Sequence, residues 1–242
     1  MPAWVAVSVV AAFLQNLRSA LQKTLTPRVG VLGATYARFL FAAPLAAGLV
    51  ALLALREPLP RVTAGFVGWG LAGAGMQVGA TLMLLRVFSL RNFAVGNTFA
   101  KTETVQAGLF GLVLLGDRLG ALALGGEPGA LMRPAFTLAC VTLVQALVMG
   151  GGLAVAARGT IGAVLRAWRV AVPVGAAGML ASLGWFVALT VATAAQVKAV
   201  GQVELLFSWL TARYAFGELP ALRETLGIAL VAGGIVAVVL AG

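Results

Sequence analysis

Histidine is absent from this 242-residue chain, and cysteine occurs once, at Cys140. Without histidine, the chain cannot build a histidine-ligated metal site or a Ser-His-Asp triad. A single cysteine cannot close an intrachain disulfide, and Cys140 lies in an apolar run without potential ligands, so we interpret it as a small core residue. The sequence also shows no Gly-rich phosphate loop and no nucleophile–base pair. We therefore expect no metal, no cofactor and no enzymatic activity.

Charged residues are scarce as well, at 10% of the chain, whereas 61% of the residues are hydrophobic and the mean hydropathy is +1.03. Soluble domains average about 25% charged residues and about 45–50% apolar residues. A water-soluble fold could not bury this much apolar surface, so the bilayer must be the solvent. The apolar runs are continuous and lack the alternation of barrel strands. The sequence therefore predicts an all-α membrane protein, a polytopic helical bundle.

The few charges that are present are mostly basic, with 17 Lys and Arg against 7 Asp and Glu and a net charge of +10. In a soluble protein this excess would suggest a nucleic-acid partner. Here the bases are spread along the predicted loops and helix ends, where they can bind lipid headgroups. We expect the lipid bilayer, and no nucleic acid, as the partner of these residues.

About eight apolar spans can be distinguished, and each is long enough to cross a hydrocarbon core of about 30 Å at about 1.5 Å per residue. Between them lie connections that contain charged residues or helix breakers, among them 26–28, 56–58, 86–92, 158–169 and 217–220. The predicted spans are 4–22, 31–55, 64–87, 93–115, 135–156, 171–192, 195–215 and 222–241.

The two halves of the chain show an internal repeat with a shift of 101 residues, the separation of Glu103 from Glu204. The same shift places spans 31–55, 64–87 and 93–115 on the fifth, sixth and seventh spans. Matched spans are three crossings apart and must run in opposite directions, which is the inverted-topology plan of many secondary transporters. We divide the chain into a first repeat of four helices (1–118), a linker (119–133) and a second repeat of four helices (134–242). The aligned pairs are Asn97 with Lys198, Lys101 with Gln202, Glu103 with Glu204, and Leu115-Gly116-Asp117 with Phe216-Gly217-Glu218.

Glu103 and Glu204 are the leading candidates for a functional site. Each lies near the middle of a predicted span, where a charged side chain costs at least about 2.5–3.5 kcal/mol. The alternative is that each belongs to a buried structural ion pair. Beside each glutamate are two polar residues at i, i+4 spacing that share a helix face, and Gln106 lies about one turn beyond Glu103. We expect one central cavity lined by Glu103, Glu204, Asn97, Lys101, Lys198, Gln202 and Gln106.

Three further side chains from other spans can reach the same cavity. Gln15 lies in the first span, Arg38 in the opening turns of the second, and Trp185 in the sixth. The alternatives are that Arg38 snorkels to lipid headgroups and that Trp185 belongs to an interfacial aromatic belt.

Several stretches resemble the EamA-type branch of the drug/metabolite transporter superfamily. They are Gly33-Ala-Thr-Tyr-Ala-Arg-Phe-Leu-Phe, Arg91-Asn-Phe-Ala-Val-Gly with Lys101-Thr-Glu-Thr-Val-Gln, Gly201-Gln-Val-Glu-Leu-Leu-Phe-Ser-Trp-Leu, and the helix-end motif Phe216-Gly217-Glu218. The resemblance implies a ten-helix, inverted-repeat carrier of the bacterial cytoplasmic (inner) membrane that moves small organic metabolites, often as an exporter. This chain is two central helices short of that plan. The repeat register places the gap at 119–133, and a second placement puts it after Arg158.

The sequence thus predicts a secondary transporter of small organic metabolites or drugs that works by alternating access. Glu103 and Glu204 would serve in proton coupling or substrate binding, in a monomer or homodimer. The alternative is a non-transporting membrane scaffold or subunit, which the two absent helices favour. The loop bases do not decide the orientation in the membrane.

Overall fold

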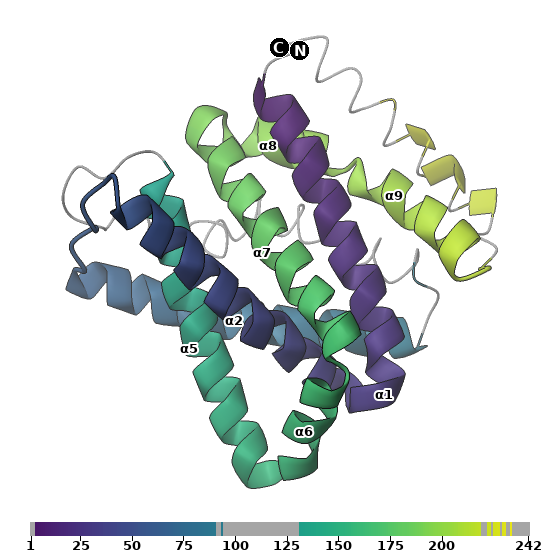
Figure 1. The fold of residues 1–242 in the computed structure, drawn as a ribbon. Helices are drawn as coiled ribbons and strands as arrows, with labels where there is room; N and C mark the ends of the chain where they lie inside the picture. The colour runs from purple at the N-terminus through teal and green to yellow at the C-terminus, as the bar shows by residue number, and fades with distance from the viewer. Residues whose placement is uncertain are drawn as a thin grey trace.

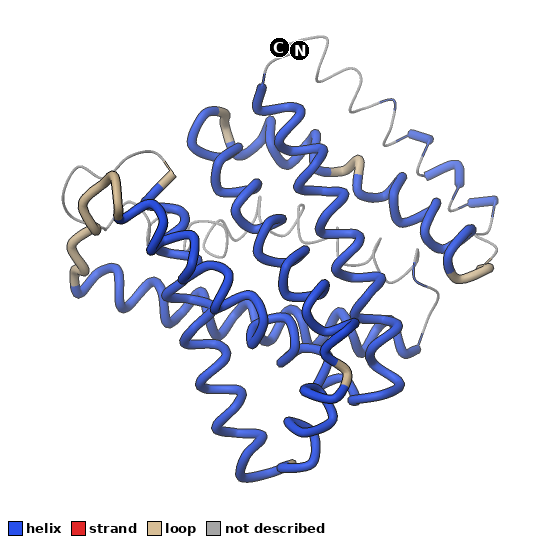
Figure 2. Tube along the Cα trace, in the orientation of Figure 1, coloured by secondary structure: helices blue, strands red, loops and turns tan. Residues whose placement is uncertain are grey.

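The chain is mainly helical in the parts that its computed structural model describes, which are residues 3–90, 93, 131–218 and the positions 222, 223, 225–227, 229, 230 and 233. No β-strand occurs among these residues, and short loops join the helices (Figures 1 and 2). The elements are α1 (Ala3–Ala54), α2 (Ala64–Leu90), α5 (Met132–Ala156), α6 (Arg158–Arg166), α7 (Trp168–Val191), α8 (Ala194–Gly201), α9 (Glu204–Leu210) and the π-helix η1 (Thr211–Ala215).

Four of these helices, α1, α2, α5 and α7, are long and apolar enough to cross a membrane. Most of their surface is not covered by other parts of the chain, which suits helices that contact lipid. The prediction of an all-α integral membrane protein is therefore confirmed. Helices α2, α5 and α7 match the predicted spans 64–87, 135–156 and 171–192 to within a few residues, and α5 begins at Met132, inside the predicted linker. The predicted span 93–115 lies almost wholly outside the described residues, as does much of span 222–241.

Helix α1 contains both of the first two predicted spans without the loop expected at Thr26-Pro27-Arg28. Its break lies at Gly30, whose φ of 72° and ψ of 172° are not helical. Glycine adopts positive φ readily because it has no Cβ, whereas Pro27 keeps helical dihedrals at the end of the first half. Gly30, rather than Pro27, thus divides α1 into two halves, and Figure 1 shows them running in different directions.

Helix α7 packs against both halves of α1 at glycines. A Cβ added at Gly184 would lie 2.9 Å from the Cβ of Ala11, in the first half of α1. A Cβ added at Gly175 would lie 2.5 Å from the Cβ of Phe41, in the second half. Small residues let helix backbones approach closely, which is a major source of helix association in membranes. Helix α7 therefore holds the two halves of α1 together.

Two glutamines connect α2 to α5. The amide nitrogen of the buried Gln145 donates to the side-chain oxygen of Gln77 at 2.8 Å and lies 3.1 Å from the carbonyl oxygen of Ala74. An amide buried among apolar helices needs such partners, because leaving it unpaired would cost free energy. Through these hydrogen bonds, Gln77 and Gln145 hold α2 and α5 together.

Residues 158–169, predicted as a connection, contain the short helix α6 between α5 and α7. The buried Val164 and the half-buried Ile161 anchor α6 in the same hydrophobic cluster as Leu153 of α5 and Val29 of α1. The spacing from 161 to 164 puts both on one helix face. The predicted connection therefore contains a helix, which this packing stabilises and which is too short to span the membrane.

The helix-end motif Phe216-Gly217-Glu218 joins the end of η1 to α1. The Glu218 carboxylate pairs with the Lys23 ammonium at 2.5 Å and accepts the Phe93 backbone N–H at 2.8 Å. The Lys23 nitrogen also lies 4.4 Å from the ring centroid of Phe216 and 5.6 Å from that of Phe93. Both charged side chains are about four-fifths buried, with 19% of Lys23 and 21% of Glu218 exposed. An ion pair in such a setting resists screening better than an exposed one.

We expect the Lys23–Glu218 pair to show a coupling free energy of about 1 kcal/mol in a double-mutant cycle. The cycle compares Lys23→Met, Glu218→Gln and the double variant by chemical denaturation of the protein in detergent. Each substitution should lower the free energy of unfolding more in the wild type than in the protein that already carries the other substitution. The reason is that one substitution alone already removes the attraction between the two side chains. Additive losses would show that the two side chains are neighbours without an energetic link.

Candidate functional site

Glu204 is the first residue of α9, and 1% of its surface is exposed. One carboxyl oxygen, Oε2, accepts a hydrogen bond of 2.8 Å from the side-chain amide of Gln15, in the first half of α1. The oxygen of the same Gln15 amide accepts a 2.9 Å bond from the indole N–H of Trp185, in α7. Gln15 therefore bridges Trp185 and Glu204, and three of the predicted site residues lie in one chain of hydrogen bonds.

A second set of polar side chains extends this cluster along α1 and α9. The side-chain nitrogen of Asn16 donates to the Thr211 hydroxyl at 2.7 Å. The Ser208 hydroxyl lies 3.1 Å from Oδ1 of Asn16 and 2.7 Å from the Glu204 carbonyl oxygen. Asn16 and Ser208 are both buried. Residues 204, 208 and 211 follow i, i+4, i+7 spacing and so present one polar face to α1. That spacing is visible in the sequence, although Ser208 and Thr211 were not predicted as site residues.

The backbone around Glu204 departs from regular α-helix, although residues 195–215 were predicted as one continuous span. The N–H groups of residues 202, 203, 205 and 206 each bond to the carbonyl three residues earlier, which tightens the turn between α8 and α9. Further on, the Phe216 N–H bonds to the Thr211 carbonyl five residues earlier, which widens η1. Such 3₁₀ and π segments inside helices often mark functional positions. The helix in the predicted span 195–215 is thus irregular at two places, before Glu204 and at η1.

The tight turn coincides with the place where Trp185 lies against Gly201. A Cβ added at Gly201 would lie 2.8 Å from Cη2 of the Trp185 indole, so a larger residue would displace the ring. Upstream, Thr193 begins α8 with a capping box in which it and Gln196 exchange side chain–backbone hydrogen bonds. The start of α8 is thus set by local sequence, whereas the contact between Trp185 and Gly201 joins two helices.

Lys198 and Gln202 are half-buried, at the end of α8 and in the following turn. The Gln202 amide lies 3.4 Å from the Lys198 carbonyl oxygen, consistent with their i, i+4 spacing. The remaining predicted site residues Asn97, Lys101, Glu103 and Gln106 lie outside the described residues. The shared cavity of Glu103 and Glu204 therefore stays a prediction.

Arg38 lies apart from this cluster, in the second half of α1. Its guanidinium donates to the Thr81 hydroxyl of α2 at 2.7 Å, and 7% of its surface is exposed. Arg18 is similarly buried, and a Cβ added at Gly178 of α7 would lie 3.2 Å from Arg18 Cδ and 3.4 Å from Arg38 Cγ. Both arginines thus lie over one glycine inside the helical bundle, and neither snorkels to the surface.

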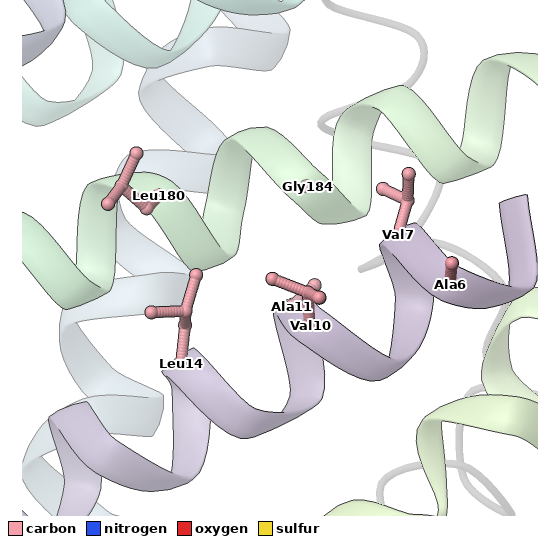
Figure 3. Close-up of a pocket in the computed structure, with 7 residues that line it drawn as sticks. All are labelled: Ala6, Val7, Val10, Ala11, Leu14, Leu180 and Gly184. Atoms are coloured by element: carbon pink, nitrogen blue, oxygen red, sulfur yellow. The ribbon is translucent and has the colours of Figure 1, made fainter. Parts of the chain in front are cut away.

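Two grooves border the first half of α1. One, of about 250 Å³, lies between α1 and α7 and is lined by apolar residues and a glycine: Ala6, Val7, Val10, Ala11, Leu14, Leu180 and Gly184 (Figure 3). The other, of about 280 Å³, lies between α1 and η1 and is lined by Phe13, Asn16, Leu17, Ala20, Leu21, Thr24, Thr211, Ala215 and Phe216. The second groove thus reaches the Asn16–Thr211 hydrogen bond of the polar cluster.

No metal-binding group of three or more acidic, histidine or cysteine side chains occurs in the described part of the chain. No protein-family model matches the sequence, and no curated protein or solved structure matches it. The functional conclusion therefore depends on the chain's own residues.

Proposed function

We propose that this chain is a secondary transporter of small organic molecules that works by alternating access, with Glu204 at its binding site. The observation that carries the proposal is the Trp185–Gln15–Glu204 chain of hydrogen bonds. Ionisable residues inside membrane helices are costly and are retained mainly at substrate and ion pathways. Glu204 is such a residue, since it is buried among helices that suit a bilayer.

The groove beside Asn16 and Thr211 supports a small, amphipathic substrate. Its volume of about 280 Å³ is just below the range of about 300–1,000 Å³ that is usual for small-molecule sites. Its walls are mainly apolar, with Asn16, Thr24 and Thr211 as polar groups. A substrate held there would contact Asn16 and Thr211, and Asn16 is hydrogen-bonded to Ser208 in the polar cluster that contains Glu204.

The irregular backbone at 199–216 supports movement at the site. Transporters commonly place binding groups on interrupted helices, where backbone groups are tolerated because they face protein rather than lipid. In this chain the 3₁₀ turn and the π-helix lie on either side of α9. A change in either would rotate Glu204 relative to Gln15 without unfolding the helix.

The proposed transporter also has the helix number, the internal repeat and the residue roles that the sequence predicts. About eight helices form two inverted-topology repeats, and Glu103 is the counterpart of Glu204 on an oppositely directed helix. The EamA-type resemblance favours export of metabolites or drugs across the bacterial cytoplasmic membrane, with proton exchange at the glutamates. Lys101 and Lys198 balance the charge of the glutamates, and the chain has no enzymatic activity.

The second candidate is a membrane scaffold or subunit that transports nothing. The groove between α1 and α7 favours it, because no polar side chain lines that groove (Figure 3). Such a surface suits an acyl chain or a neighbouring helix better than a polar substrate.

Flux across vesicles separates the two functions. The purified protein is reconstituted into liposomes, and a panel of radiolabelled organic cations, organic anions and neutral amphipathic compounds is tested for uptake under an imposed pH gradient and for counterflow. We expect saturable uptake of at least one compound above protein-free vesicles. Folded, correctly inserted protein that moves no member of the panel in either format would favour the scaffold.

A further inference from the structure

Helix α6 lies where the chain turns between two candidate membrane helices, α5 and α7 (Figure 1). Because nine residues are too short to span a bilayer, α6 belongs at the membrane surface. Its inner face is anchored by Val164, which is fully buried. Arg158 and Arg166, eight residues apart and therefore on nearby parts of the helix circumference, are exposed.

Two more exposed arginines lie at the same end of the molecule. Arg169 follows α6 in the first turn of α7. Arg28 precedes Val29, which belongs to the same hydrophobic cluster as Val164, so the bend of α1 lies beside α6. We name Arg28, Arg158, Arg166 and Arg169 the basic end.

The sequence stretches that form the basic end contain no acidic residues. The sequence contains no Asp or Glu before Glu57 and none between Glu127 and Glu204, so the stretches that form the basic end carry positive charge only. The loop between α1 and α2 differs, because Glu57 lies there between Arg56 and Arg61.

Large apolar side chains accompany the arginines. Trp168 is 55% exposed and Leu165 is 52% exposed, and the Arg169 guanidinium lies 5.7 Å from the Trp168 ring centroid. Tryptophan favours the level of the lipid headgroups, and basic amphipathic helices bind anionic membrane surfaces. This surface therefore carries both apolar side chains, which can contact the acyl chains near the headgroups, and arginines, which can bind lipid phosphates.

We propose that the basic end binds the headgroups of anionic lipids, with the phosphates at Arg28, Arg158, Arg166 and Arg169 and Trp168 inserted at the headgroup level. Anionic lipid then stabilises the turn between α5 and α7, because it is attracted to arginines that otherwise repel one another. Lipid binding at the basic end does not depend on transport, because it rests only on the charges of the four arginines and on the place of α6 in the fold.

Thermal unfolding with added lipid tests the proposal. The detergent-solubilised protein is heated with equal amounts of phosphatidylglycerol, phosphatidylcholine or inorganic phosphate. We expect phosphatidylglycerol to raise Tm by about 4 °C more than phosphatidylcholine does, and to lose most of this advantage at 1 M salt, where the Debye length is about 3 Å. An equal rise with phosphatidylcholine, or an equal rise with inorganic phosphate, would overturn the proposal.

Two double variants that remove equal charge show which arginines cause the phosphatidylglycerol-specific rise in Tm. Arg158→Gln/Arg166→Gln should lose at least half of the phosphatidylglycerol-specific rise, whereas Arg56→Gln/Arg61→Gln, which removes the same charge from the α1–α2 loop, should keep it. Arg158→Lys/Arg166→Lys should also keep most of it and shows that the positions tolerate substitution. A full rise in the first variant, or equal losses in the first two, contradicts the assignment to α6.

Discussion

Substitution of Glu204 by glutamine should reduce transport by the reconstituted protein to about a tenth of the wild-type rate or less. Glutamine keeps the size of the side chain and an oxygen that can accept from Gln15, but it removes the charge and the exchangeable proton. A hydrogen bond to a charged group contributes about 1.5–3 kcal/mol. The loss of one such hydrogen bond to the substrate, or of the exchanged proton, corresponds to a transport rate that is lower by roughly tenfold or more.

The control for this variant is Glu57→Gln, which makes the same chemical change in the loop between α1 and α2. Initial uptake rates are compared at equal amounts of inserted protein, and both variants are checked for an unchanged Tm. We expect Glu57→Gln to transport at the wild-type rate. Wild-type rates and an unchanged pH dependence in Glu204→Gln would remove Glu204 from the mechanism.

Gly175→Ala should lower Tm by about 4–8 °C, the largest stability effect that we expect from a single methyl group. The added Cβ would lie 2.5 Å from Phe41 Cβ, 2.7 Å from the Phe41 carbonyl carbon and 2.8 Å from the Ala42 nitrogen. Two of these atoms belong to the backbone, so no rotamer change can relieve the overlap and α7 must move away from α1. Overpacking of this kind costs about 1–3 kcal/mol, and each kcal/mol shifts Tm by about 2–4 °C in a chain of this size, so that a cost of about 2 kcal/mol gives the stated shift.

The matched control is Gly152→Ala, in the interior of α5. A Cβ added there meets nothing within 4 Å, and alanine favours helix over glycine by about 0.5–1 kcal/mol. Its Tm should stay the same or rise. Equal Tm values for the two variants, measured by thermal unfolding in one detergent, would mean that α1 and α7 do not pack as closely as described.

The sequence predicted Gln15 and Glu204 as site residues because polar groups in apolar spans are costly and need partners, and it predicted Trp185 as a wall of the same cavity. It could not predict their pairing. That pairing depends on the relative register of α1, α7 and α9, which side-chain packing determines. The Asn16–Ser208–Thr211 contacts were missed for the same reason, although the spacing of Ser208 and Thr211 puts them on the same face as Glu204.

The fold class followed from composition, whereas local geometry did not. Nothing in the hydropathy of residues 4–55 distinguishes a break at Gly30 from one at Pro27, because both residues interrupt helices. Helix α6 was not predicted because Arg158, Gly159 and Arg166 are residue types that are common in connections. The helix forms because Val164 packs against α1 and α5. The irregular turn before Glu204 likewise coincides with the contact between Trp185 and Gly201, which is a tertiary contact.

The central claim is that Glu204 binds the transported molecule, and equilibrium binding tests it most directly. A compound found in the flux panel is titrated by calorimetry into detergent-purified wild type, Glu204→Gln and Glu57→Gln at one pH. We expect the Kd of Glu204→Gln to be at least about tenfold higher than that of the wild type, with Glu57→Gln unchanged, because a charged contact is lost in the first variant only. The same Kd for all three proteins would contradict the claim.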